Sequence, residues 1–109
     1  MSQFQARAAV AKALAHPSRL IMLDALEKEE KCVCDLQKLV GADMSTVSKH
    51  LSVLKAAGLV IDRKEGLWVY YRLTCPCLGE FMRCIDGVID RQKRADELKD
   101  RPTTGCFCG

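Results

Sequence analysis

Seven cysteines are the residues of this 109-residue chain whose type and spacing could do chemistry. Six of them form pairs with one residue between the two thiols: Cys32 and Cys34, Cys75 and Cys77, and Cys106 and Cys108. Thiolates bind soft, thiophilic ions and are readily oxidised, so each pair is a candidate for an ion-binding or a redox-sensitive site. Because seven is an odd number, the cysteines of one chain cannot all pair as disulfides.

The first pair lies in KCVCDL, residues 31–36, where charged neighbours flank both thiols. Lys31 and Asp35 disfavour full burial, so we interpret Cys32 and Cys34 as ligands for a thiophilic ion. The alternative is that they are small apolar fillers. Consecutive helical residues are rotated by about 100°, so residues two apart point about 200° apart. The pair therefore either precedes a helix or unwinds its first turn when both thiols hold one ion.

The second and third pairs lie near predicted helix and chain ends. Cys75 and Cys77 stand in TCPC, where a last helix should begin, and a helix N-terminus makes thiols more reactive. They are candidates for redox chemistry or for a second thiolate site. Cys106 and Cys108 lie in a terminal stretch typical of a flexible tail, which could lend a ligand to another site. Cys84 lies beside an apolar stripe and is expected to pack in a core.

Composition narrows the class of protein. The 17 basic and 14 acidic residues give a formal charge of +3, which alone favours a polyanionic partner only weakly. Apolar residues make up 49% of the chain, enough for the core of one domain. No apolar run approaches the roughly 20 residues of a membrane helix, and MSQFQARAAV lacks a signal-peptide pattern. We therefore expect a cytoplasmic protein without a membrane partner, where cysteines serve more often as metal ligands or redox sensors than in disulfides.

Apolar periodicity predicts the helices that must position the thiols. Alanine-rich residues 4–15 predict a first helix, and Pro17 begins a second with His16 as its cap. Residues 33–40 and 44–57 predict two short helices joined by a tight turn that contains glycine. Two short helices joined in this way are typical of a helix-turn-helix.

The apolar pattern then changes from a helical period to a strand-like alternation. Residues 59–73 predict a β-hairpin whose turn lies near residues 64–66. Leu67 is expected to share one face of the second strand with Val69 and Tyr71. A hairpin directly after a helix-turn-helix is a wing.

Residues 78–98 predict a last amphipathic helix with a broad apolar stripe. In so small a domain, part of that stripe is expected to face a second subunit. The predicted fold is mainly α with a β-hairpin wing, a winged helix-turn-helix over residues 1–98. Residues 99–109 are predicted to form a flexible tail that contains cysteines.

The helix that follows the tight turn carries groups suited to reading DNA. Five polar residues near its N-terminus are predicted on its outer face: Ser45, Thr46, Ser48, Lys49 and His50. A recognition helix contacts base edges with such groups at its N-terminal end. Arg63 and Lys64 on the wing would contact phosphate and fix the register on the duplex. A solvated polar face is the alternative for the helix alone, but its neighbouring helix and wing favour DNA binding.

The order of these motifs resembles a known family. The segments ALAHPSRLIMLDAL, CVCDL, STVSKHLSVLKAAGLV and DRKEGLWVYYRL, within about residues 6–90, are similar in order and spacing to the ArsR/SmtB metal-sensing repressors. CVCDL most resembles the branch that responds to arsenite or antimonite. The resemblance implies a homodimer formed through the first and last helices. It also implies that this dimer binds double-stranded operator DNA at an inverted repeat and leaves when the inducer binds.

The resemblance also assigns roles to the thiols. Cys32 and Cys34 match the metalloid-binding cysteines of that branch, which often has a third cysteine where Gln37 stands here. The donors that remain for a third ligand are Cys84, which is expected to be packed, and the other paired cysteines: Cys75, Cys77, Cys106 and Cys108.

Three other functions stay open beside arsenite or antimonite sensing. The same fold could sense cadmium, lead or zinc, since these ions also bind thiolates. It could also sense thiol oxidation or persulfides. A small dithiol reductase or metal carrier is the remote alternative. No C-x-x-C motif beside a βαβ pattern supports it, and no nucleophile with a placed base does.

Overall fold

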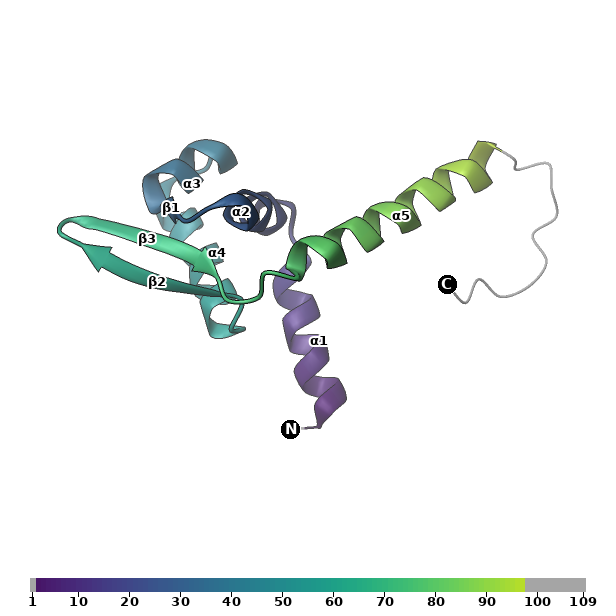
Figure 1. The fold of residues 1–109 in the computed structure, drawn as a ribbon, viewed down its shortest axis with the longest axis horizontal. Coiled ribbons are helices and arrows are strands. Elements are labelled where there is room, and N and C mark those ends of the chain that lie inside the picture. Colours follow the sequence, from purple (N-terminus) through teal and green to yellow (C-terminus); the bar gives the residue numbers. More distant parts are fainter. Residues whose placement is uncertain (1, 98–109) are drawn as a thin grey trace. The chain divides into compact units, whose positions relative to one another are not determined.

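The computed structural model describes residues 2–97, and the chain divides into two compact units that meet after Leu78. Figure 1 labels the elements in chain order. They are α1 (Gln3–Leu14), α2 (Pro17–Lys28), β1 (Lys31–Cys32), α3 (Val33–Val40), α4 (Met44–Ala56), β2 (Val60–Glu65), β3 (Trp68–Leu73) and α5 (Leu78–Glu97). This order confirms the predicted winged helix-turn-helix architecture, with β1 as an additional strand.

Helices α1 and α2 begin where side chains satisfy free backbone N–H groups. The Ser2 hydroxyl accepts from the N–H of Gln5, and the Gln5 amide oxygen accepts in return from the N–H of Ser2. Nδ1 of His16 accepts from the N–H of Ser18 at 3.1 Å, and Pro17 occupies the first position of α2. The predicted cap at His16 is confirmed.

The turn between α3 and α4 depends on one glycine and one aspartate. Gly41 ends α3 with a φ of 73°, a left-handed conformation that costs glycine little. Oδ1 of Asp43 accepts from the N–H of Thr46 at 2.7 Å and caps α4. These signals place α3 at the predicted residues and end α4 within one residue of the expected position.

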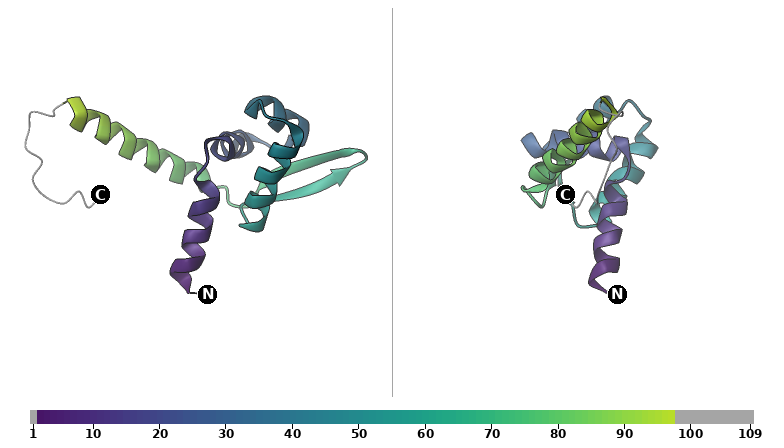
Figure 2. Two further views of the ribbon diagram at one scale, coloured as in Figure 1. Left: turned by 180° about the vertical axis from the view of Figure 1, so that it is seen from behind. Right: turned by 90° about the vertical axis from the view of Figure 1, so that its right-hand side faces the viewer.

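The sheet has the strand order β1–β3–β2, and both pairings are antiparallel. Figures 1 and 2 show the β2–β3 hairpin extending from the helices as a wing. The prediction that Leu67 lies in the second strand is wrong, because Gly66 and Leu67 form the turn and Leu67 is 99% exposed. Strand β1, which sequence analysis did not predict, adds Lys31 and Cys32 to the edge of β3.

The core of the first unit joins three helices and the first strand of the wing. Its most deeply buried side chains are Met22 and Leu23 of α2, Leu36 of α3, Val47, Leu51 and Leu54 of α4, and Val60 of β2. The buried residues of α4 recur at helical spacing and form a stripe on one face of the helix. Leu39 of α3 is 52% exposed and lies outside this core.

Helix α5 begins at Leu78, the last residue of the first unit. The rest of the helix is the described part of the second unit. Apolar side chains on it remain exposed in the single chain: Phe81, Ile85, Val88 and Ile89. Cys84 is exposed too, so its expected place in a core is wrong for the single chain. Among the described residues, no helix combines the length and apolar character needed to cross a membrane.

Candidate DNA-binding surface and thiol sites

The first turn of α4 is organised around Asp43. The Ser45 hydroxyl donates to Oδ1 of Asp43 at 2.9 Å, and that same oxygen accepts from the N–H of Thr46. The Thr46 backbone bond, with bonds from the Thr46 and Ser45 hydroxyls, lowers the pKa of Asp43. Ser45, Ser48 and Lys49 are exposed on this helix, and Thr46 is half-buried. Four of the five predicted recognition residues therefore keep access to solvent.

The expected outward position of His50 is wrong. Its side chain is only 9% exposed, and its Nδ1 accepts from Nε of Arg19 at 3.1 Å. The ring centroid lies 4.3 Å from that of His16, the N-cap of α2. Burial lowers the pKa of His50, and the nearby His16 and Arg19 lower it further. Position 50 falls within the buried stripe of α4, a periodic signal that the sequence already contained.

Arg63 on the wing is held by carboxylates of its own chain. Its Nε and Nη2 donate to Glu30 at 3.0 and 2.7 Å, and its Nη1 donates to Glu65 at 2.7 Å. The guanidinium also lies over the Tyr70 ring, 4.7 Å from the centroid. The bond to Glu30, followed by the bond to Glu65, raises the pKa of Arg63. The positive charge of Arg63 is therefore largely balanced within the chain.

Lys64 and Arg72 provide the other cations of the wing. Both side chains are exposed, and the Lys64 ammonium makes no hydrogen bond or ion pair within the described part of the chain. Arg72 was not among the residues predicted to contact DNA, although it alternates with the apolar positions of its strand. It lies near enough to Glu30 to lower the pKa of that carboxyl.

Cys32 and Cys34 straddle the junction between β1 and α3. Cys32 is the last residue of β1 and the N-cap of α3, with an extended backbone (φ −70°, ψ 148°), and Cys34 lies in the first turn of α3. Since only Cys34 is helical, the wide angular separation of two helical residues does not apply. The Cys32 thiol lies near enough to Cys34 to raise the pKa of the Cys34 thiol. One ion could therefore reach both sulfurs without unwinding α3.

The two thiols differ in their burial. Cys32 is 8% exposed, which is contrary to the expectation from its charged neighbours, because pairing with β3 holds it against the sheet. Cys34 is half-buried. Burial raises the pKa of Cys34, as do the nearby Cys32 thiol and the charge of Asp35, whereas the charge of Lys38 lowers it. Cys34 is therefore mainly a protonated thiol at neutral pH.

A complete three-ligand site is absent from the described residues. No three His, Cys, Asp or Glu side chains among residues 2–97 come close enough to hold one ion. Cys75 and Cys77 therefore do not complete the site of Cys32 and Cys34 within one chain as it stands. Cys106 and Cys108 lie outside the described residues.

Cys75 and Cys77 lie together in the turn between β3 and α5. Their Sγ atoms are 2.7 Å apart, so the two sulfurs are in direct contact. Cys77 is exposed and Cys75 is half-buried. This second pair is a separate dithiol, nearer to solvent than the first.

Comparison with known proteins gives the class. Residues 16–62 match the family described as "Bacterial regulatory protein, arsR family". An uncharacterized HTH-type transcriptional regulator of Methanocaldococcus jannaschii is 34% identical over 87 residues, which are 79% of this chain and 98% of that protein. The chain belongs to the ArsR/SmtB family. Its members are DNA-binding transcriptional regulators with the fold described above.

Two further proteins are similar over most of the chain. The arsenic resistance transcriptional regulator ArsR1 of Pseudomonas putida is 32% identical, over 91% of this chain and 84% of its own length. A solution structure of a homodimeric winged helix-turn-helix DNA-binding domain from Mycobacterium bovis, a possible ArsR-family regulator, has a TM-score of 0.70. That structure is 29% identical and covers 96% of this chain and 97% of its own.

The ArsR-family match covers one thiol pair and leaves the other outside. Residues 16–62 run from the cap of α2 into β2 and so include Cys32, Cys34 and all of α4. Cys75 and Cys77 come after the match ends. The match to the family model therefore covers the helix-turn-helix and the pair Cys32 and Cys34, and it does not cover the pair Cys75 and Cys77.

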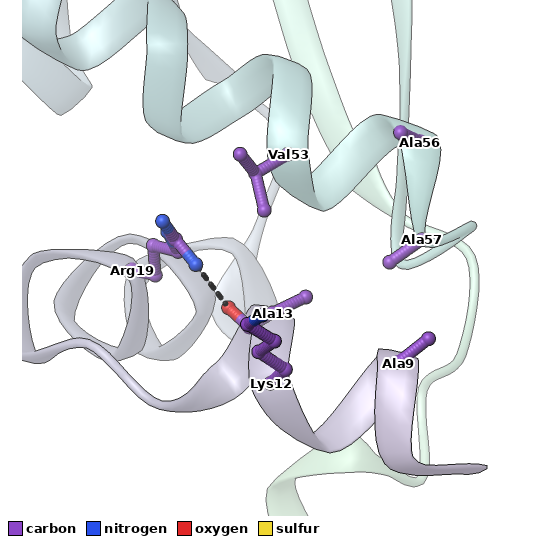
Figure 3. A pocket seen from close by; sticks show the side chains of 7 residues that line it. All are labelled: Ala9, Lys12, Ala13, Arg19, Val53, Ala56 and Ala57. Carbon is purple, nitrogen blue, oxygen red and sulfur yellow. Dashed lines mark hydrogen bonds between the residues drawn. The ribbon is translucent and has the colours of Figure 1, made fainter. Parts of the chain in front are cut away.

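An open cavity of about 450 Å³ lies between α1, α2 and α4 (Figure 3). Its wall is formed mostly by small side chains, and Nη1 of Arg19 donates to the carbonyl of Ala13 at its edge. The lining residues are Ala9, Lys12, Ala13, Arg19, Val53, Ala56 and Ala57. Lys12 and Arg19 are its only charged residues, and no carboxylate, histidine or cysteine lines it.

Proposed function

We propose that this ArsR-family regulator is a repressor that leaves its operator when trivalent arsenic or antimony binds Cys32 and Cys34. The position of Cys32 carries the proposal. It belongs at once to β1, which pairs with β3 of the wing, and to the N-cap of α3. An ion held by Cys32 and Cys34 would therefore act on the wing and on the helix-turn-helix together.

The energy needed for such a response is small. A coupling free energy of about 1.4 kcal/mol between ion and operator already changes DNA affinity tenfold. Helix α3 is short, residues 33–40, and Gly41 ends it just before the turn into α4. A shift at the start of α3 therefore has a short path to the recognition helix.

The thiolate donors favour soft ions. Cys34 must lose its proton to bind an ion. Because the pKa of Cys34 is raised, only an ion that binds sulfur strongly can replace the proton at neutral pH. Trivalent arsenic and antimony bind sulfur strongly enough to displace the proton. Cadmium, lead or zinc is the alternative inducer, because all three also bind thiolates.

The DNA surface that we propose combines α4 with the wing. Ser45, Thr46, Ser48 and Lys49 would face base edges and neighbouring phosphates in the major groove. Lys64 would contact phosphate directly. Arg63 would do so by exchanging its bonds to Glu30 for bonds to the duplex. His50 is not part of this surface, because it packs between α2 and α4.

A homodimer formed through α1 and α5 would complete the regulator. Phe4 of α1 is 75% exposed, and the apolar residues of α5 need a partner surface. The similar domain from Mycobacterium bovis is homodimeric. A two-fold dimer presents two recognition helices, so we expect an inverted-repeat operator. Binding to chromosomal DNA implies a cytoplasmic location.

An operator-release experiment tests the sensor. The promoter fragment of the protein's own operon is bound by the reduced protein and titrated with arsenite, antimonite, cadmium, zinc and peroxide. We expect arsenite and antimonite to release the DNA at the lowest concentrations, because they prefer sulfur ligands most strongly. Release by cadmium or zinc at lower concentrations would reassign the inducer. Release by peroxide alone would favour the redox alternative.

Salt dependence tests the DNA surface. A dimer with about six phosphate contacts should show a slope near −5 in a log–log plot of affinity against salt, because each contact releases counterion. Lys49→Ala should weaken binding and flatten the slope. Lys28→Ala, at the end of α2, is the matched control and should change neither. If the affinity for DNA did not change between about 50 and 200 mM salt, the proposed DNA-binding surface would be rejected.

A further inference from the structure

The segment Cys75–Pro76–Cys77–Leu78 forms a β-turn that brings two thiols together. The N–H of Leu78 donates to the carbonyl of Cys75 at 3.2 Å, the bond that closes such a turn. Proline suits the second position of a β-turn, because its ring fixes φ near the required value. The turn thus holds the Sγ atoms of Cys75 and Cys77 2.7 Å apart.

Both ends of this turn are anchored in the first unit. The N–H of Thr74 donates to the carbonyl of Leu59 at 3.0 Å, and the Thr74 hydroxyl donates to the carbonyl of Gly58. On the other side, Leu78 is 7% exposed. The dithiol therefore sits in a fixed turn, tied to the residues that directly follow the recognition helix.

We propose that Cys75 and Cys77 form a reversible intrachain disulfide by exchange with low-molecular-weight disulfides such as oxidised glutathione. This is a modification site separate from Cys32 and Cys34. It requires neither a thiophilic ion nor DNA, so it stands independently of the proposed inducer.

The exchange proceeds in two balanced steps. The exposed Cys77 thiolate attacks one sulfur of the small disulfide, forming a mixed disulfide and expelling one small thiolate. Cys75 then loses its proton and attacks the Cys77 sulfur, which expels the second small thiolate. Two protein thiols are oxidised by two electrons, one small disulfide is reduced, and the two protons pass to the leaving thiolates.

The first dithiol is poorly suited to this reaction. Cys32 is buried and Cys34 is half-buried, so both sulfurs are less accessible to a small disulfide than that of Cys77. Cys32 is also held in β1 by its pairing with Tyr70. Solvent access to Cys77 and contact between the sulfurs instead favour the second pair.

Peptide mapping tests the proposal, because trypsin separates the pairs. Cleavage after Arg72 and Arg83 gives a peptide with Cys75 and Cys77 alone, and cleavage after Lys31 and Lys38 isolates the first pair. The full chain is equilibrated with mixtures of reduced and oxidised glutathione, and remaining thiols are alkylated. We expect peptide 73–83 to lose two hydrogens, without alkylation, at ratios that leave peptide 32–38 fully alkylated. The opposite order, or peptide 73–83 alkylated throughout, would overturn the proposal.

Variants test the order of the steps. Cys75→Ser should trap glutathione on Cys77, because the thiol that resolves the mixed disulfide is gone. Cys84→Ser, the matched control on α5, should leave the disulfide unchanged. A tenfold dilution of the protein should not slow formation of the bond, since both thiols belong to one chain. Slower formation on dilution, or no adduct in Cys75→Ser, would reject the intrachain mechanism.

Discussion

Two Cys-x-Cys pairs lie at strand–helix junctions of this chain, and the junctions differ in one respect. At the first, β1 passes into α3 with no residue between them, so Cys32 belongs to the strand and Cys34 to the helix. At the second, a β-turn separates β3 from α5, and both Cys75 and Cys77 lie in it. The same spacing thus yields a partly buried pair and a solvent-accessible pair.

This difference separates two kinds of thiol chemistry. An ion bound by both Cys32 and Cys34 would connect β1 with α3, so its binding would shift the two elements relative to each other. This arrangement suits a sensor of ions. Cys75 and Cys77 already touch within one turn, which suits a bond that forms and breaks without moving other elements. Spacing alone does not distinguish these roles, whereas backbone conformation and burial do.

The largest expected effect is on ion-driven release from DNA. Cys34→Ser should bind the operator with near-normal affinity and no longer be released by arsenite, because one of two anchoring thiolates is lost. Cys77→Ser, the matched variant at the second junction, should be released normally. Fluorescence anisotropy of a labelled operator measures both. Release of Cys34→Ser at the wild-type arsenite concentration would reverse the assigned roles.

A smaller effect concerns the number of sulfur ligands. A trivalent metalloid is commonly satisfied by three thiolates, and no third ligand clusters with Cys32 and Cys34 among residues 2–97. We propose that Cys106 or Cys108 supplies it, aided by the high effective concentration of a tethered thiol. Arsenic X-ray absorption should then count one sulfur fewer in a chain that ends at Thr104. An unchanged count that falls with Cys75→Ser would assign the third ligand to the second junction.

Alkylation rates should differ severalfold between the junctions. Iodoacetamide reacts with thiolates, so at neutral pH Cys77 should react before Cys34, which is less exposed and has a pKa raised mainly by burial. The Cys34 rate should keep rising beyond pH 9.0, the ordinary pKa of a thiol. Asp35→Asn should speed the reaction, because it removes a negative charge that raises this pKa. Equal rates by mass spectrometry would mean that burial does not protect the first pair.

The smallest effect is on stability. Cys32→Ser places a hydroxyl where a buried thiol packs, which should cost about 1–2 kcal/mol. Cys77→Ser changes an exposed side chain and should stay within about 0.5 kcal/mol of the parent. Urea unfolding of both variants at one protein concentration gives the difference, since stability of a dimer depends on concentration. A larger loss for Cys77→Ser would show that its turn is a structural support.

Much of the fold could be predicted because its signals are local. The caps at His16 and Asp43, and the glycine stop at Gly41, act within a few residues of the helix ends that they fix. The buried stripe of Val47, Leu51 and Leu54 follows from helical periodicity. The same stripe includes His50, whose position on the helix and not its polarity decides that it is buried.

Other features had no local signal. Strand β1 has two residues and exists only through its pairing with Tyr70 and Tyr71. The pairing of Arg63 with Glu30 likewise joins residues far apart in the sequence. Neither contact leaves a periodic pattern in the chain, so composition and spacing could not predict it.

The sequence by itself determined the Cys-x-Cys spacings, the helix boundaries and the hairpin, because caps, turns and periodicity act over a few residues. Only the tertiary structure decided which thiols are accessible. Pairing of β1 with β3 buries Cys32, whereas the bond from Leu78 to Cys75 closes a turn that leaves Cys77 exposed. Reactivity depends on burial and on contacts between distant segments, and those exist only once the chain has folded.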